Sequence, residues 1–280
     1  MSIRRRGPAA VALALSMGAL AACGGGDDGG QDARTAPPPT ATMDSTPTAG
    51  GSPEQPGGTG ALRGKTIVID PGHNGGNARA SSVINRQVDI GNGRKACDTT
   101  GTATNAGYSE HAFTWDVSLR LRRVLQAQGA KVILTRSNDK GVGPCIDKRA
   151  AIGNDANADA VISVHADGAG PSQHGFHIIE PAYVRGVNTQ EVVEESHELA
   201  LDLRAAFRAG TGTPYSNYRG KDAIDRRDDL GGLNLSDVPK VFIECGNMRN
   251  SREAARLSDP GFRQKIANAI AKGVDDYLDD

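Results

Sequence analysis

Short apolar runs, separated by glycine, proline and polar residues, recur along the chain from residue 66 onward. Runs of this length that are rich in valine and isoleucine are typical of buried β-strands. They predict strands at 66–70, 131–135, 160–164, 175–180 and 240–244. Between the strands lie segments with helical periodicity, at 110–128, 147–157, 190–209, 251–257 and 260–278. This alternation predicts an α/β domain with a mixed, mostly parallel sheet of about six strands and helices on both faces.

Three of the predicted strands end at residues whose side chains can bind metals or transfer protons. The first strand ends at Asp70, with His73 three residues later. His165 directly follows the strand at 160–164, and the last strand ends at Glu244. In an open α/β sheet, ligands bind just beyond the carboxyl ends of the strands. We therefore expect these side chains to converge on one site.

Glu110 is a charged residue in an apolar position. It begins the helix at 110–128 and shares one helical face with Phe113, Val117 and Leu121. A carboxylate at a helix N-terminus can simply interact favourably with the helix dipole. A partly buried carboxylate, however, is costly without an ion-pair or metal partner. Glu110 is therefore also a candidate ligand of a cation.

Two histidines and one carboxylate are a typical protein ligand set of catalytic zinc, which keeps a fourth position open for water. His73, Glu110 and His165 form such a set. Zinc would lower the pKa of that water to ~7. Glu244, at another strand end, suits the role of general base. The residues come from distant segments, so their spacing alone is a weak signal.

The N-terminal segment has the features of an export signal. Arg4, Arg5 and Arg6 precede an apolar stretch at 8–22 that is short for a mature transmembrane helix. The end of this stretch, "LAAC" at 20–23, resembles the lipobox of bacterial lipoproteins, which implies cleavage before Cys23 and a lipid on its sulfur. A plain secretory signal with an incidental cysteine is the alternative. We expect a signal peptide at 1–22. The mature protein is then expected in the cell envelope, anchored by its lipid to the outer face of the cytoplasmic membrane or located in the periplasm.

Residues 23–62 are rich in glycine, proline and threonine and lack apolar periodicity. Such a segment cannot bury enough surface to fold, so it predicts a flexible tether. Residues 63–280 suffice for one catalytic domain with its own core. The formal net charge of −1 argues against a nucleic-acid partner, which usually requires a basic surface. We expect a monomer whose only membrane contact is the lipid.

Three cysteines remain after Cys23, in an exported chain that permits disulfides. Cys97 and Cys145 lie in polar, glycine-containing loops, whereas Cys245 directly follows the strand that carries Glu244. We predict a Cys97–Cys145 disulfide and a buried free thiol at Cys245, although three pairings are possible. The disulfide would pin the long segment at 74–107, which is predicted to be an irregular flap close to His73.

Several segments carry a family resemblance when they are taken in order. They are "VIDPGHNGG", "SEHAFTWDVSLRLRRVL", "VILTR", "KRAAIGNDANADAVISVHADG" and "VPKVFIECGNMRN". Together they resemble the zinc-dependent N-acetylmuramoyl-L-alanine amidases of the amidase-3 type, especially the actinobacterial single-domain members. The resemblance covers nearly all of residues 64–278. It implies zinc ligands at His73, Glu110 and His165 and a catalytic glutamate at Glu244.

The resemblance also implies a substrate and a reaction. Members of this family hydrolyse the amide between the lactyl group of N-acetylmuramic acid and the L-Ala that begins the stem peptide of peptidoglycan. Asp70 is then expected to orient the turn that carries His73, or a ligand, from behind. Arg227 and Asn234 precede the last strand and are candidate contacts of the substrate groove.

Four other histidines have plainer interpretations. His111 points about 100° away from Glu110 around the helix, so it is not expected to be a ligand. His174 and His177 flank a predicted strand and are expected at the polar surface or behind the ligands. His197 lies among glutamates on a helix face that is expected to be solvated.

Two further functions remain as alternatives. A lipoprotein that binds peptidoglycan without cleaving it would be expected to lack a ligand or Glu244, and neither is missing. A zinc carboxypeptidase that acts on stem peptides has a His-x-x-Glu pair, whereas His73 is followed by Asn74, Gly75 and Gly76. The presence of all four residues favours the amidase.

Overall fold

The computed structural model describes residues 60–279, and the predicted fold class is confirmed. A six-stranded sheet has the order β4-β1-β5-β8-β6-β7. Its strands are, in that order, Lys131–Leu134, Thr66–Pro71, Ala160–Asp167, Lys240–Asn247, His177–Pro181 and Ile224–Arg227. All neighbours are parallel except β6, which runs antiparallel to β8. The carboxyl ends of β1, β5 and β8 therefore meet at one edge of the sheet.

The register of the central strands aligns residues that are distant in the sequence. Glu244 on β8 lies opposite His165 on β5. It also lies opposite His177 on β6. Side chains at directly opposed positions project from the same face of a sheet. His165, Glu244 and His177 therefore form a row across three strands.

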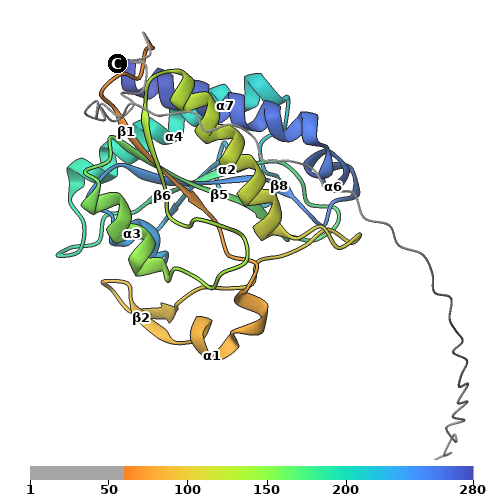
Figure 1. Ribbon diagram of the computed structural model, residues 1–280, viewed down its shortest axis with the longest axis horizontal. Coiled ribbons are helices and arrows are strands. Elements are labelled where there is room, and N and C mark those ends of the chain that lie inside the picture. Colours follow the sequence, from red (N-terminus) through yellow and green to blue (C-terminus); the bar gives the residue numbers. More distant parts are fainter. Residues whose placement is uncertain (1–59, 280) are drawn as a thin grey trace, which may run out of the picture. The chain divides into compact units, whose positions relative to one another are not determined.

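One face of the sheet is covered by three helices that enclose the main core (Figure 1). They are α2 (Glu110–Ala127), α4 (Gln190–Thr211) and α7 (Pro260–Asp279), and the shorter α6 (Ser251–Ser258) precedes α7. Alternate residues of the strands, such as Ile69, Val164 and Ile243, are fully buried against them. The apolar stripe of α2 that the sequence predicts thus packs inward, and it places Glu110 at the edge of the core.

The opposite face carries a smaller core beneath α3 (Ile146–Asp155) and the short α5 (Gly231–Asn234). Val68 and Val161 pack there with Ala158. Farther along the same strands, this face presents polar residues instead of apolar ones. The two faces of β1, β5 and β8 therefore differ. One is apolar and packs in the main core, and the other carries polar candidate site residues near the carboxyl ends of the strands.

The segment at 74–107 is more ordered than the sequence predicts. It contains η1 (Asn77–Arg79), α1 (Ser81–Ile84) and a hairpin of β2 (Gln87–Asp89) and β3 (Arg94–Ala96). These elements are too short to show a periodicity in the sequence. The predicted Cys97–Cys145 disulfide is present and joins the end of the hairpin to the start of α3, while Cys245 is a buried free thiol.

The polar stretch at 211–237, for which the sequence predicts no helix or strand, contains β7 and α5. β7 (IDRR) is nearly devoid of apolar residues, so only its pairing with β6 makes it a strand. Leu62, expected at the end of the tether, is fully buried in the main core, and its N–H donates to the carbonyl of Gln128.

The predicted signal peptide at 1–22, Cys23 and nearly all of the predicted tether lie outside the described residues. Within residues 60–279, no helix combines the length and the hydrophobicity needed to cross a membrane.

Candidate metal centre and active site

Glu110 is held in the site by the backbone. It is the first residue of α2, and the Thr102 N–H donates to its Oε2 at 2.9 Å. The Ala166 N–H donates to its Oε1 at 3.2 Å. Only 5% of Glu110 is exposed. Two main-chain donors from different segments therefore fix the carboxylate, and its Oε1 faces the two predicted histidine ligands.

His73 presents one ring nitrogen to the carboxylate and the other to the 74–107 segment. Its Nε2 lies 3.1 Å from Glu110 Oε1. Its Nδ1 lies 3.2 Å from the carbonyl oxygen of Thr99. Because a carbonyl oxygen can only accept, this contact calls for a proton on Nδ1 and leaves Nε2 facing Glu110, where a cation could replace its proton. The turn is unusual, since His73 has a positive φ of 59°.

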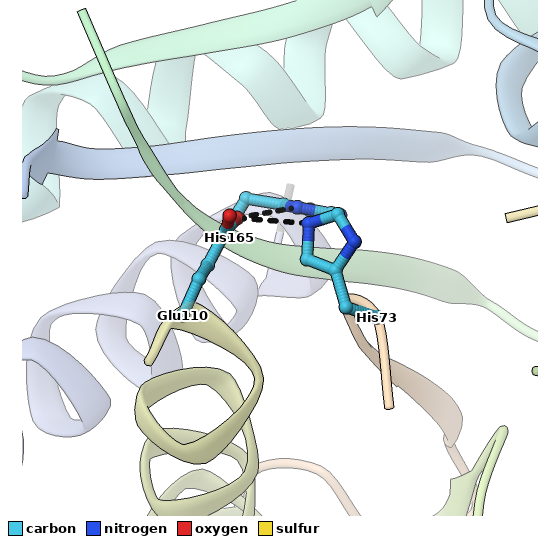
Figure 2. A group of neighbouring side chains, drawn as sticks. All are labelled: His73, Glu110 and His165. Carbon is cyan, nitrogen blue, oxygen red and sulfur yellow. Dashed lines mark hydrogen bonds and ion pairs between the residues drawn. The ribbon is translucent and has the colours of Figure 1, made fainter. Parts of the chain in front are cut away.

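His165 completes the cluster from β5. Its Nδ1 lies 3.1 Å from Glu110 Oε1, and its ring stacks on Phe242 at a centroid distance of 5.1 Å. Figure 2 shows both imidazole rings converging on the Glu110 carboxylate. Gly72 makes room for this ring, because a Cβ there would lie 2.2 Å from His165 Cε1.

The three side chains fit a divalent cation. One ligand atom from each of His73, Glu110 and His165 can be chosen so that all three lie within 4.8 Å of one another. Two imidazole nitrogens and a carboxylate oxygen are a donor set that suits zinc and leaves a fourth position for water or substrate. The structure thus brings together the three residues that the sequence predicts as ligands.

The electrostatics of the cluster show how strongly it attracts positive charge. Burial acts to lower the pKa of His73, but the Glu110 carboxylate and Asp98 overcome this and raise it to about 10. Burial acts to raise the pKa of Glu110, but His73 and His165 hold it well below its usual range. In the metal-free protein a proton therefore supplies the positive charge that a cation would bring.

Glu244 lies beside the cluster, on the same face of the sheet as His165. With Arg227, Asp167 and the three candidate ligands it lines a hollow of about 420 Å³. Its Oε2 is buried and has no hydrogen-bond partner among the described residues. Burial, with the nearby charges of Glu110 and Asp167, raises the pKa of Glu244 well above its ordinary value. A carboxyl group in this environment is suited to take up and release a proton.

Asp70 is paired with Arg149, a buried residue that is not among the candidates predicted from the sequence. The Arg149 guanidinium donates to Asp70 Oδ1 at 2.8 Å and to Asp98 Oδ2 at 3.0 Å. It also donates to the carbonyl oxygen of His73 at 3.0 Å. The pKa of Asp70 is low despite its burial, because Lys240 and Arg149 both lie against it. Arg149 occupies a buried position of α3, so a charged residue on a buried helix face was the signal available in the sequence.

The two predicted groove residues, Arg227 and Asn234, lie in different surroundings. Arg227 lines the hollow beside Glu244, and Asp229 accepts from its Nε and Nη2 at 2.8 Å each. Asn234 was expected to contact substrate, but it is fully buried, so this expectation is wrong. Its amide donates to the carbonyl oxygens of Ile90 and Asp228, which ties α5 to the neighbouring loops.

The remaining histidines correct part of the sequence analysis. His111 pairs with Asp139 at 2.8 Å and is no part of the cluster, as expected. His197 is not simply solvated, because its Nδ1 lies 2.6 Å from the buried carboxylate of Glu180 on β6. His177 is only 2% exposed and lies opposite Glu244, which excludes the polar surface and agrees with the other predicted place, behind the residues of the site. Both placements depend on sheet packing that the local sequence does not reveal.

The 74–107 segment lies beside His73, as predicted. Its residues Lys95, Asp98 and Thr99 line a second cavity, of about 270 Å³, that reaches His73 and His165. Lys95 also forms an ion pair of 2.8 Å with Asp229, on the loop that follows β7. This segment therefore forms one wall of the site.

The chain was compared with known proteins. The sequence profile of a family described as N-acetylmuramoyl-L-alanine amidase matches residues 67–276. The N-acetylmuramoyl-L-alanine amidase Rv3717 of Mycobacterium tuberculosis is 41% identical over 219 residues, which cover 78% of this chain and 88% of that protein.

Solved structures give the same result. The N-acetylmuramyl-L-alanine amidase Ami1 from Mycobacterium smegmatis has a TM-score of 0.73 at 40% identity and covers 78% of this chain and 98% of its own. The apo form of Ami1 from Mycobacterium abscessus has a TM-score of 0.71 at 42% identity, with coverage of 78% and 100%.

Proposed function

This chain belongs to the N-acetylmuramoyl-L-alanine amidase family, and we propose that it acts through a zinc ion held by His73, Glu110 and His165. It is a peptidoglycan hydrolase. The bond it cleaves is the amide between the lactyl group of N-acetylmuramic acid and the L-Ala of the stem peptide. The observation that carries the zinc proposal is the convergence of one carboxylate and two imidazoles, with Glu244 directly beside them.

The ligand residues are prepared for a metal by their own contacts. The main-chain donors on Glu110 hold its carboxylate in place, and the Thr99 carbonyl orients the ring of His73. A zinc ion bound there would supply the Lewis acidity that polarises the scissile carbonyl and activates water near neutral pH. The stacking of Phe242 limits rotation of the His165 ring.

Glu244 is proposed as the general base and then the general acid. Its carboxylate takes a proton from the attacking water as the C–O bond forms at the scissile carbonyl. As the C–N bond breaks, the carboxyl group passes this proton to the leaving nitrogen of L-Ala, so that the amine departs neutral. The buried position of the Glu244 carboxyl oxygen favours the neutral, protonated form between these two steps.

Arg227 is proposed to contact the substrate. It lines the same hollow as Glu244, and the paired Asp229 carboxylate fixes its guanidinium. A guanidinium in a fixed position is well suited to bind a carboxylate, and stem peptides carry such groups. Asp70 is proposed to act from behind the site, through Arg149.

The location of the enzyme is proposed from the N-terminal sequence. We infer a signal peptide at 1–22, a lipid on Cys23, and a tether from Cys23 to shortly before Leu62 that lets the catalytic domain reach the cell wall. A single acyl chain binds membranes only marginally, so stable anchoring needs more than one chain, as bacterial lipoproteins have. We propose that the protein is monomeric.

The test is a product analysis of the full-length protein, purified in detergent and loaded with zinc. Incubation with a purified muropeptide should release an intact stem peptide with a free L-Ala amine, detected by mass spectrometry. The Glu244→Ala variant should release none. Shortened stems would instead indicate a peptidase, and zinc binding without any cleavage would indicate a binding protein.

A further inference from the structure

His177 occupies a place next to Glu244 that the proposed reaction does not explain. The two residues are directly opposed in the antiparallel pair of β6 and β8. On its other side Glu244 is opposed by His165, a candidate ligand. The row across the sheet therefore runs from the metal cluster to Glu244 and then to His177.

Both side chains contain a buried polar atom that has no partner. Among the described residues, neither Nδ1 of His177 nor Oε2 of Glu244 has a hydrogen-bond partner. Buried polar atoms in folded proteins nearly always have partners, because leaving them without one is costly. Two such atoms on adjacent positions of one sheet face indicate that they complete each other when the site is at work.

The His177 imidazole is neutral, so it can donate from one ring nitrogen and accept at the other. Burial lowers its pKa to about 4, although Asp167 and Asp225 act in the opposite direction. The edge of its ring meets Tyr218 at a centroid distance of 5.9 Å and an angle of 85°, which limits its orientation.

His177 is placed to act on Glu244 and not on the substrate. It does not belong to the residues that line the hollow beside the cluster, whereas Glu244 does. Its exposed fraction is only 2%, so the strands and Tyr218 shield it from bulk water. A residue in this position lies next to the carboxylate and outside the hollow proposed to hold the scissile bond.

We propose that His177 is a positioning residue for Glu244, joined through Nδ1–H to Oε2 directly or by one water molecule when substrate is bound. This contact would leave the other carboxylate oxygen, Oε1, to exchange the proton with water and with the leaving nitrogen. Such contacts are often long in the absence of substrate and tighten in the working complex. The inference rests on the proposed function, because it assigns Glu244 the proton transfer.

The experiment compares His177→Leu with His177→Asn in the full-length, zinc-loaded protein acting on a muropeptide. Leucine removes the polar atoms at a similar volume, and kcat should fall about tenfold to a hundredfold, in the range typical for residues that support catalytic groups. KM and the zinc content should stay close to those of the wild type. Asparagine carries a polar group near the position of Nδ1 and should restore most of kcat.

His174→Leu is the matched control, since His174 lies in the loop before β6 and is not among the residues lining the hollow. It should leave kcat unchanged. Equal kcat in the wild type and His177→Leu would overturn the positioning role alone. A wild-type enzyme that releases no stem peptide would overturn the proposed function together with this role.

If His177→Leu misfolds, which circular dichroism would detect, a comparison of His177→Asn with His177→Gln still tests the positioning role. Asparagine extends its polar group to the region of Nδ1, whereas glutamine extends it to the region of Nε2. The positioning role predicts a higher kcat for His177→Asn than for His177→Gln at equal thermal stability. The reverse order, or equal values, would contradict it.

Discussion

The ligand side and the Glu244 side of the site differ in how well their buried polar atoms are partnered. On the ligand side, both oxygens of Glu110 accept main-chain hydrogen bonds, and Nδ1 of His73 contacts Thr99. On the other side, Oε2 of Glu244 and Nδ1 of His177 have no partner among the described residues. The protein itself thus prearranges the proposed metal ligands, whereas substrate and water are left to complete the surroundings of the base.

This difference has a physical reason. A metal centre gains affinity when its ligands are already oriented, because little order remains to be imposed on binding. A general base must change its protonation state during each turnover, and a carboxylate whose lone pairs were all occupied by fixed donors would be a poor base. Substitutions on the two sides of the site should therefore have different effects on metal binding and on turnover.

Replacement of Glu110 should remove both metal and activity. Glu110→Gln deletes the charge that faces both imidazoles, so zinc content should drop and turnover should fall by at least about a thousandfold. Zinc can be measured by mass spectrometry after dialysis. Glu198→Gln, on the exposed side of α4, is the control and should bind zinc normally. Full zinc content in Glu110→Gln would remove Glu110 from the ligand set.

Replacement of Glu244 should separate activity from metal binding. Glu244→Gln keeps the shape of the side chain but cannot accept the proton, so kcat should fall about a hundredfold to ten-thousandfold. The zinc content should match that of the wild type. A loss of zinc in this variant would mean that Glu244 is a ligand, and the contrast between the two sides would then be wrong.

Arg149 should matter more for stability than its distance from the chemistry suggests. Arg149→Met leaves the buried carboxylates of Asp70 and Asp98 without their main partner. Breaking a buried ion pair in this way costs about 3–5 kcal/mol of the free energy of unfolding, which urea denaturation would measure.

Arg123 is exposed, so its replacement is the control for the loss of stability expected in Arg149→Met. Arg123→Met should change the free energy of unfolding by less than about 0.5 kcal/mol. Similar values for the two variants would show that the ion pairs of Arg149 contribute little to the stability of the fold.

Removal of the disulfide should have a somewhat smaller effect. Cys97 and Cys145 are separated by 48 residues, and closing a loop of this size stabilises a domain by about 2–4 kcal/mol. The double variant Cys97→Ala/Cys145→Ala should lose that amount in urea denaturation. Reductant should destabilise the wild type and leave the double variant unchanged. Equal sensitivity of both proteins would contradict the prediction.

The smallest expected effect is a pH dependence of the metal-free protein. Although burial acts in the opposite direction, Glu110 and Asp98 raise the pKa of His73 to about 10. The unfolded value is ~6.5. The charged imidazole therefore stabilises the fold fully below that value, and its contribution is lost as the pH rises toward 10.

Zinc separates this contribution from those of other groups. Thermal unfolding of the chelated protein should weaken more steeply between pH 7 and about 10 than that of the zinc-loaded protein, in which His73 is deprotonated at every pH of the series. Parallel curves for the two forms would show that His73 and the metal do not compete for the same nitrogen.

The local sequence carried much of the fold and the main candidates of the site. All five predicted strands coincide with observed strands to within three residues at either end. Three residues were predicted as ligands because they interrupt or end apolar patterns, and the structure brings them together: His73, Glu110 and His165. A polar residue at the end of a buried run is visible without any knowledge of the fold.

Other features could not be predicted from local patterns. β7 and the hairpin of β2 and β3 are too short and too polar to show a period. Asn234 is polar, as a residue of a substrate groove would be, but its neighbours bury it completely. For such segments the pairing partner decides the structure, and that partner lies elsewhere in the chain.

The sequence by itself determined which segments are buried, where helices begin, and which chemical groups stand at the strand ends, because burial and backbone periodicity are written into consecutive residues. Only the tertiary structure decided that Arg149 supports His73 and that His177 faces Glu244. Those relations depend on sheet register and on packing between distant segments, and register is a property of two strands together.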